Sequence, residues 1–379
     1  MIIIFAGALG RFPVGGHAWT EMQYLLTLRS LGHDVFFLEE CGTGSWVYNY
    51  DTQKITTDLD YPTLYVRKCL DPIGFGNRWI YRAGDNSVGM HTDEFLDICS
   101  RADLLLIRGS PIILWRREYN WPRRRIFVDS DPGFTQFAIM NGDRNLIGTI
   151  DRCENLFTTG QRIGADDCTI PTAGRTWIKT VLPVALAYWP PDENNGASQF
   201  TSVMQWRSYQ DIVYNGVTYG NKEKEFPKFI ELPKVTEQRF CIALTGGIPE
   251  DLKKYDWDVR PGWVISSSPD SYREFIQESR AEFGVAKHGY VESRSGWFSD
   301  RSACYLASGR PVLVQDTGQG DWLPVGEGIV TFRNFQEALT GINTINTDYE
   351  HHRRSARSIA EKYFSADKVL SALLDEAMA

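Results

Sequence analysis

The first forty residues decide the fold, and they read MIIIFAGA (1–8), LGRFPVGGHAW (9–19) and TEMQYLLTLRSLGHDVFFLEE (20–40). The first stretch is an apolar run of strand length, and the second is rich in glycine. The third carries apolar residues at helical spacing from Met22 to Leu28, and Gly32 then ends the helix before a second apolar strand. Strand, turn, helix and strand together predict a βαβ unit, which is right-handed and has parallel strands.

The same alternation continues along the chain. Apolar runs typical of buried strands lie at 102–109, 125–133 and 154–160. A Pro-Pro pair and an Asn-Asn-Gly run then predict a linker within residues 182–198.

After the linker, strands and helices are predicted again. The strands are expected at 200–206, 240–247 and 311–320, an amphipathic segment at 221–233, a helix followed by a strand at 268–289, and helices at 298–309, 335–344 and 349–378. This pattern predicts an α/β fold with two Rossmann-like domains, at 1–185 and 198–354, followed by a C-terminal helix at 355–379. We expect the two domains to face each other across a cleft that holds the ligands.

Composition excludes several classes of protein. The 379 residues are 42% hydrophobic and 23% charged, which is enough for packed cores and excludes a disordered chain. The formal net charge is -8, so general nucleic-acid binding is not expected. No apolar run reaches the ~20 residues of a membrane span, and the N-terminus lacks the basic region of a signal peptide.

Seven cysteines are scattered without a CxxC pair or a histidine pair at ligand spacing. This pattern is typical of reduced, mostly buried thiols in a cytoplasmic protein, and it argues against a zinc site.

His17 is the candidate base of the first half. It follows Gly15 and Gly16 in the turn after the first strand, where glycines allow close approach to a ligand and where an imidazole suits the deprotonation of a hydroxyl. Turn structure or acceptor binding is the alternative role of His17. The spacing in GALGRFPVGG does not supply GxGxxG, so neither NAD nor FAD is expected.

Asp129 and Asp131 end a buried strand on the same side as His17. Either could orient the histidine or bind a substrate hydroxyl, and Asp131 is the candidate catalytic partner. A turn stabilised by an aspartate side chain before Pro132 explains the pattern equally well.

Two cations in the second half could neutralise a diphosphate leaving group. Arg207 follows a strand and Lys222 lies near the start of the next helical segment, where surface charge is the alternative interpretation. Gly246 and Gly247 end another strand and are further candidate ligand-binding positions.

The segment SRSGWFSDRSACYLASGRPVLVQDTGQG (293–320) holds the most informative pattern. Ser299 is the predicted N-cap of a helix whose first-turn amides, aided by Arg301, can bind an anion. After the next strand, an Asp-Thr-Gly loop can bring amides and a carboxylate to the hydroxyls of a sugar. The candidate ligand-binding residues of the segment are Ser295, Ser299, Asp300, Arg301, Ser302, Asp316, Thr317 and Gly318.

This segment resembles the donor site of GT-B glycosyltransferases, and the chain is most similar to their CgeB-like group, which is named for a spore-coat maturation protein. The resemblance covers nearly the whole chain. The stretches that carry it are FVDSDPGFTQ (127–136), FTSVMQW (200–206), YGNKEKEF (219–226) and SRAEFGVAKHGYVESRSGWFSDRSACYLASGRPVLVQDTG (279–318).

The resemblance implies a transferase that moves a hexose or pentose from a nucleotide-diphosphate sugar to a hydroxyl. It implies that residues 1–185 bind the acceptor, that 198–354 bind the donor, and that the C-terminal helix crosses back to the first domain. Arg207 and Lys222 resemble the Arg/Lys pair that holds the donor diphosphate, although their spacing is longer. The GT-B architecture implies a metal-independent reaction, so neither a metal nor another cofactor is expected.

One motif of the retaining enzymes is missing. The two glutamates of the E-x7-E motif would fall at Trp297 and Cys304, so contact with the ribose would pass to Asp300 or Ser302. His17 occupies the place where many inverting relatives keep their base. The two features together favour inversion.

Two other functions remain open: a nucleotide-sugar 2-epimerase, and a non-catalytic protein that binds a nucleotide sugar or a glycan. The acceptor is also open. Aromatic segments at 46–50 and 115–121 are compatible with a carbohydrate, a small molecule or a modified base.

Overall fold

The computed structural model describes residues 1–109, 112–191, 196–208, 210–247, 249 and 251–379. The chain forms two units: unit 1 comprises Met1–Thr159, Thr172–Ala185 and Ala366–Ala379, and unit 2 comprises Gly160–Pro171 and Leu186–Ser365. Part of the predicted linker, residues 192–195, lies outside the described residues.

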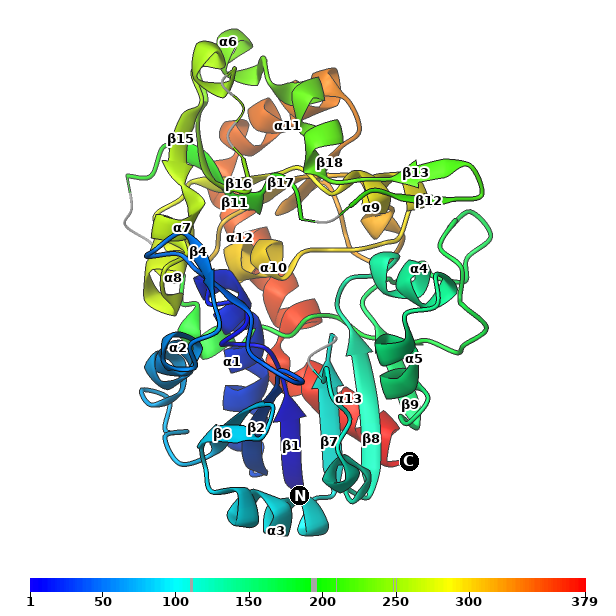
Figure 1. The fold of residues 1–379 in the computed structure, drawn as a ribbon. Coiled ribbons are helices and arrows are strands. Elements are labelled where there is room, and N and C mark those ends of the chain that lie inside the picture. Colours follow the sequence, from blue (N-terminus) through cyan, green and yellow to red (C-terminus); the bar gives the residue numbers. More distant parts are fainter. Residues whose placement is uncertain (110–111, 192–195, 209, 248, 250) are drawn as a thin grey trace. The chain divides into compact units, whose positions relative to one another are not determined.

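Unit 1 is built on an eight-stranded sheet in the order β10-β9-β8-β7-β1-β2-β5-β6 (Figure 1). Neighbouring strands are parallel except β5 and β6. The strands are β1 (Ile2–Ala6), β2 (Asp34–Glu40), β5 (Trp79–Ala83), β6 (Asn86–Gly89), β7 (Leu104–Arg108), β8 (Arg124–Asp129), β9 (Asn155–Thr158) and β10 (Ile178–Lys179), with a separate hairpin of β3 (Val47–Asn49) and β4 (Lys54–Thr56).

The helices of unit 1 lie between these strands along the chain, except α13, which returns to unit 1 after the last helix of unit 2. They are α1 (Gly15–Ser30), α2 (Asp60–Leu70), α3 (Thr92–Arg101), α4 (Phe134–Met140), α5 (Arg144–Ile150) and α13 (Ala366–Met378), with a 3-10 turn at Arg117–Asn120; the 3-10 turn at Leu186–Tyr188 belongs to unit 2. Because β1 pairs with both β2 and β7, the order of the strands reverses at β1. In such sheets ligands bind at the carboxyl ends of the strands beside that reversal.

Unit 2 repeats the plan with a six-stranded parallel sheet in the order β15-β14-β11-β16-β17-β18. Here the order reverses at β11, between β14 and β16. The strands are β11 (Gln199–Gln205), β14 (Arg239–Thr245), β15 (Asp258–Pro261), β16 (Ala281–Gly284), β17 (Val312–Gln315) and β18 (Ile329–Phe332), with a hairpin of β12 (Ile212–Tyr214) and β13 (Val217–Tyr219).

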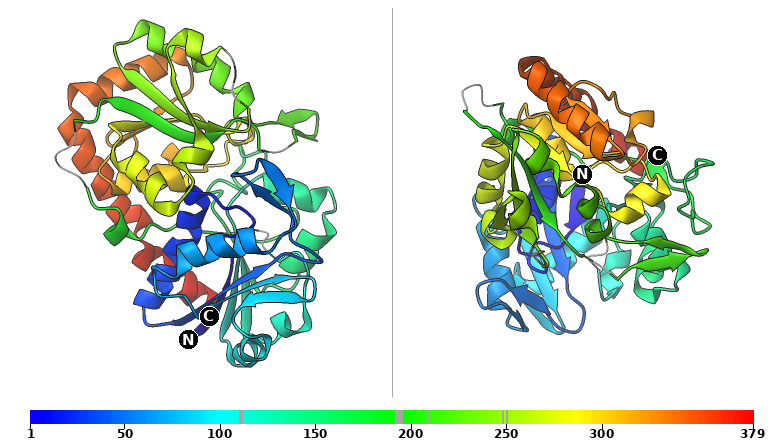
Figure 2. Two further views of the ribbon diagram at one scale, coloured as in Figure 1. Left: turned by 60° about the vertical axis from the view of Figure 1, so that its left-hand side comes forward. Right: turned by 90° about the horizontal axis from the view of Figure 1, so that it is seen from above.

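The helices of unit 2 pack around this sheet, as Figure 2 shows from two further sides. They are α6 (Leu232–Val235), α7 (Gly262–Ile265), α8 (Pro269–Gln277), α9 (His288–Ser293), α10 (Asp300–Ala307), α11 (Phe335–Thr347) and α12 (Tyr349–Ile359), with 3-10 turns at Lys222–Lys224, Phe226–Phe229, Leu252–Tyr255 and Gln319–Asp321 and a π turn at Ala360–Phe364.

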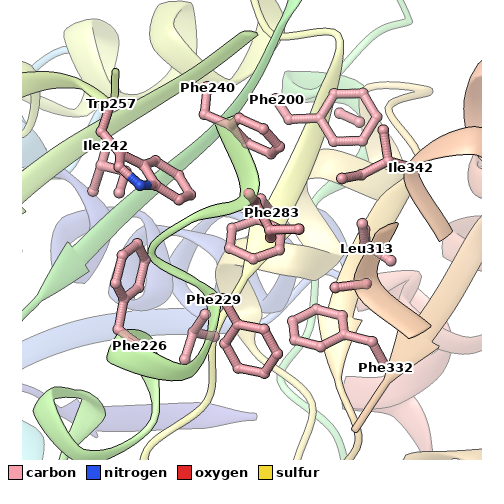
Figure 3. Close-up of a cluster of buried hydrophobic side chains, with 14 of the residues drawn as sticks. Phe200, Phe226, Phe229, Phe240, Ile242, Trp257, Phe283, Leu313, Phe332 and Ile342 are labelled. Carbon is pink, nitrogen blue, oxygen red and sulfur yellow. The ribbon is translucent and has the colours of Figure 1, made fainter. Parts of the chain in front are cut away.

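The core of unit 2 is aromatic and centres on Phe283 of β16 (Figure 3). Its ring stacks on Phe332 at a centroid distance of 5.4 Å and contacts Phe240 edge-on at 5.5 Å. Since side chains alternate along a strand, the neighbouring Glu282 points to the opposite face, where it meets α10. One strand therefore supplies both the core and the buried carboxylate of the site.

Three local predictions were wrong. Gly15, Gly16 and His17 lie in the first turn of α1 rather than in the preceding loop. The amphipathic segment 221–233 forms two 3-10 turns and the start of α6 rather than one continuous helix, since Pro227 and Pro233 interrupt it. The closing helix is broken at Ser365, so that α12 belongs to unit 2 and α13 to unit 1.

Candidate functional site

His17 lies at the carboxyl edge of the unit 1 sheet, next to the strand reversal. Its side chain is 26% exposed, and its Nε2 lies 3.1 Å from Nη2 of Arg108, the last residue of β7. The same Nε2 lies 3.4 Å from Oε1 of Glu21, so it is placed between a group that only donates and a group that only accepts.

Glu21 holds Arg108 in place from one turn further along α1. Its carboxylate accepts from Nε of Arg108 at 2.9 Å, pairs with Nη2, and accepts from the N–H of Ala8 at 3.0 Å. Burial alone would raise the pKa of Glu21, but Arg108 and its hydrogen bonds lower it to about 2. The result is a buried ion pair with the imidazole of His17 at its edge.

Asp129 and Asp131 differ in their surroundings. The buried Asp129 carboxylate accepts hydrogen bonds from Thr135, Gln136 and Thr158 at 2.6–2.9 Å, and burial raises its pKa. It also accepts from the N–H of Asp131 at 3.0 Å. This hydrogen bond forms the turn before Pro132 that was the alternative interpretation of the sequence. Asp129 therefore stabilises the loop, and the half-buried Asp131 is the carboxylate nearer to solvent.

Arg301 is the central cation of unit 2. Its Nε donates to Glu282 at 2.6 Å, and its Nη1 donates to the carbonyl of Val203 in β11 at 2.8 Å. Burial would lower the pKa of Arg301, but the Glu282 carboxylate raises it. The ion pair spans β16 and α10, and it fixes the guanidinium beside the strand reversal.

Lys222 is a second buried cation, with 7% of its surface exposed. Burial lowers its pKa well below 10.5, and the positive charges of Arg301 and Lys287 lower it further. Glu282 and Asp300 offset only part of this effect. Among the described residues no carboxylate forms an ion pair with its ammonium group.

Four of the predicted residues line one pocket of unit 2: Ser299, Arg301, Ser302 and Thr317. Ser299 is the N-cap of α10, and its Oγ accepts from the N–H of Arg301 at 3.2 Å. The Thr317 hydroxyl donates to the carbonyl of Trp297 at 2.6 Å, which joins the two loops on either side of the pocket.

The other predicted residues of the 293–320 segment support these loops. Ser295 is buried, and its Oγ accepts from the N–H of Trp297 at 3.2 Å. Asp316 accepts from the N–H of Gly318 at 2.8 Å, and Asp300 is the first residue of α10. Gly318 has φ +88°, and a Cβ there would lie 2.7 Å from the side chain of Arg162.

Arg207, Gly246 and Gly247 form a separate group at the ends of β11 and β14. The half-exposed Arg207 side chain lies 3.5 Å from Glu223, and a Cβ on Gly246 would lie 3.2 Å from the carbonyl oxygen of Arg207. The charges that act on Lys222 are those of Arg301, Glu282, Lys287 and Asp300, whereas Arg207 pairs with Glu223.

Several residues at the two strand reversals could not be identified from the sequence. Glu21 and Arg108 meet across 87 residues, and the Glu225 carboxylate meets the His288 ring across 63. Arg108 ends a buried strand, which is the one feature that could have marked it.

Within the described ranges, no group of three or more His, Cys, Asp and Glu side chains could hold a metal ion. Across the same part of the chain, no helix combines the length and the apolar character needed to span a membrane.

Several solved structures share this architecture over the whole chain. An alpha-glucosyltransferase in complex with UDP and a 13-mer DNA has a TM-score of 0.62 at 11% identity, covering 100% of this chain and 99% of its own. The Anabaena protein HepE, in complex with UDP and glucose, has a TM-score of 0.59 at 11% identity, covering 99% and 100%.

Sucrose-phosphate synthase from Thermosynechococcus elongatus has a TM-score of 0.53 at 11% identity, covering 99% of each chain. No family model matches the sequence, and no curated protein matches it. These likenesses show the fold, which is the GT-B fold of glycosyltransferases; the predicted α/β class with two Rossmann-like units is confirmed.

Proposed function

We propose that this chain is a glycosyltransferase that moves a sugar from a nucleotide-diphosphate sugar to an acceptor hydroxyl. Unit 2 would bind the donor, as in the implied GT-B scheme. The observation that carries this proposal is the buried Lys222 ammonium, which lies near Arg301 and has no carboxylate partner among the described residues.

A buried cation without a counter-ion is costly, and it is best explained by an anionic ligand that completes the site. A diphosphate fits the arrangement. Arg301 and Lys222 supply positive charge, and the first-turn amides of α10 can donate to phosphate oxygens. These groups would stabilise the charge that develops on the leaving diphosphate, so the proposal needs no metal.

In unit 1 we propose His17 as the base that deprotonates the acceptor, with Asp131 as its candidate partner. In the present arrangement Nε2 contacts both Arg108 and Glu21, so it must leave these contacts before it can take a proton from an acceptor hydroxyl. A base that deprotonates the acceptor hydroxyl is compatible with inversion, and inversion is part of the proposal.

A non-catalytic protein that binds a nucleotide sugar is the second candidate. It is favoured by Trp297, which occupies the place of the first missing glutamate and stacks on Tyr290 at 4.3 Å, and by the engaged Nε2 of His17. The hexose or pentose, the CgeB-like group, the cytoplasmic compartment and the acceptor class remain expectations from the sequence.

The test is a turnover assay with UDP-, GDP-, dTDP-, CDP- and ADP-sugars, combined with thermal shifts for the same nucleotides. A nucleotide at 100 times its Kd stabilises the protein by ~2.7 kcal/mol. We expect one nucleotide family to bind and its sugar to be transferred or slowly hydrolysed.

His17→Gln should keep donor binding and lose about 10²- to 10⁴-fold in rate, as loss of a general base does. His33→Gln is the matched control, since His33 lies at the other end of α1 and should leave the rate unchanged. Binding without turnover in the wild type would favour the second candidate, and full activity of His17→Gln would remove His17 as the base.

A further inference from the structure

Glu225 is a buried carboxylate in unit 2 that is not among the candidate residues predicted from the sequence. Its Oε1 accepts from Nδ1 of His288 at 2.7 Å and from Nζ of Lys228 at 2.8 Å, and its Oε2 accepts from Gln315 at 2.5 Å. Burial would raise the pKa of Glu225, but these hydrogen bonds lower it. An ionised carboxylate only accepts, so Nδ1 of His288 carries a proton.

The backbone brings His288 against the turn that holds Lys222. The N–H of His288 donates to the carbonyl of Asn221 at 3.3 Å, and the N–H of Glu225 donates to the carbonyl of Lys222 at 2.9 Å. His288 therefore bonds to the residue before Lys222 through its backbone and to the residue three positions after Lys222 through its ring.

The other ring nitrogen of His288 is available to a ligand. The side chain is 22% exposed, and Nε2 bonds to no residue that the structure describes. His288 also directly follows Lys287 in the sequence, and the positive charge of Lys287 lowers the pKa of Lys222. A carboxylate against Nδ1–H fixes the orientation of an imidazole and stabilises a positive charge on it.

We propose that His288 is a further donor-binding residue, that its imidazolium form donates from Nε2–H to a phosphate oxygen of the nucleotide diphosphate, and that Glu225 is its positioning residue. The inference rests on the proposed function, because it names a contact within the same donor site. Through Gln315, which also lines the pocket of unit 2, Glu225 joins the histidine to the floor of that pocket.

The alternative is a structural clamp in which the pair only ties the 222–225 turn to β17. Such a clamp would affect stability and every ligand alike. A phosphate contact would instead affect the affinity for a nucleoside diphosphate and spare the affinity for the parent nucleoside.

The test is calorimetric titration of wild type and His288→Gln with UDP, GDP, dTDP, CDP and ADP, and displacement titration with the parent nucleosides. A hydrogen bond to a charged group corresponds to a loss of roughly 10- to 100-fold in affinity, which we expect for the diphosphate that binds wild type. Affinity for the nucleoside should change less than about twofold. Glu225→Gln, whose amide oxygen still accepts from Nδ1 but lacks the charge, should show a smaller loss of the same kind.

Two further variants serve as controls for Glu225→Gln and His288→Gln. Lys228→Met removes another partner of the same carboxylate, and His351→Gln removes an exposed histidine that lies 2.9 Å from Glu327 in the same unit. Both should bind the diphosphate as wild type does. If His288→Gln does not fold, the ring ¹⁵N signal of His288 in the wild type is measured instead, and it should shift when the diphosphate is added.

The outcomes separate the two proposals. Unchanged diphosphate affinity in His288→Gln, an equal loss for the nucleoside, or an unmoved ring signal overturns the role of His288 and leaves the proposed function standing. If no nucleoside diphosphate binds wild type, the proposed function fails and this inference fails with it.

Discussion

Lys222 links the stability of the protein to its proposed function at the scale of one residue. Its folded-state pKa lies well below the unfolded value of 10.5, so the folded protein holds this proton less tightly than the unfolded chain does. The loss of folding free energy caused by this lowered pKa is greatest at pH values below the folded pKa. It shrinks as the pH rises from there toward 10.5. A bound diphosphate would remove the same cost by supplying the missing counter-charge.

Lys222→Met should therefore be more stable than wild type at pH 7 and should bind the nucleoside diphosphate more weakly. We expect the melting temperature to rise by about 2–4 °C for each kcal/mol of relieved cost, and the advantage to shrink as the pH is raised to 9.5. Melting curves at both pH values and calorimetry provide the measurement.

Lys254→Met is the control for that variant, because Lys254 is exposed and pairs with Asp251. It should leave the affinity unchanged. A Lys222→Met protein with wild-type affinity would show that no anion is held at this lysine.

The role of a single residue could be predicted from the sequence where it depends only on the residues next to it in the chain. Ser299 precedes a helix that begins with Asp300, so its role as N-cap could be predicted, and the structure shows the hydrogen bond. Glu21 and His288 gave no such signal, because each acts through a partner on a distant segment that only the tertiary fold brings close.

At the scale of the element, α10 is the helix that supports the proposed donor site. Its N-terminus is capped by Ser299, its second residue holds Glu282, and its first turn borders the pocket of unit 2. Loss of the cap should thus affect both the helix and the anion that the helix is proposed to bind.

Ser299→Ala should lower the free energy of unfolding by about 1 kcal/mol, the usual effect of losing an N-cap, and should also weaken diphosphate binding. Asn334→Ala is the matched variant, since Asn334 caps α11 by accepting from the N–H of Glu337 at 2.9 Å. It should lose similar stability and keep full affinity. Denaturant unfolding with calorimetry separates the two effects, and equal affinities in the two variants would argue against an anion at α10.

The long apolar strands and the capped helices could be predicted because each carries its own periodic pattern. The short hairpins could not, since strands of three residues hold too little pattern. The 221–233 segment was misassigned because its two prolines matter more than its amphipathic spacing. The break at Ser365 could not be foreseen, since the residues on both sides favour helix.

In the molecule as a whole, strands β9-β8-β7-β1-β2-β5 of unit 1 follow the same order as the sheet of unit 2, and each order reverses at one strand, β1 or β11. Each unit places buried ion pairs at its own reversal: Glu21 with Arg108 in unit 1, and Glu282 with Arg301 in unit 2. Solved structures share the fold at 11% identity, because the fold requires the pattern of strands and helices and few particular residues.

A metal-independent reaction is the expectation for the proposed transferase, since cationic side chains and helix amides would stabilise the leaving diphosphate. Treatment with EDTA followed by dialysis should change the turnover rate by less than about twofold. The control is re-addition of Mg²⁺ or Mn²⁺, which should not raise the rate. Loss of turnover in EDTA that either ion restores would contradict this expectation.

We propose above all that unit 2 binds the diphosphate of a nucleotide-sugar donor at the carboxyl ends of β11 and β16. The sharpest test is a crystal structure with the nucleoside diphosphate that gives the largest thermal shift. We expect its phosphate oxygens within hydrogen-bond distance of Lys222 and of the first-turn amides of α10. A nucleotide bound in unit 1, or bound in unit 2 with its phosphates away from Lys222, would contradict it.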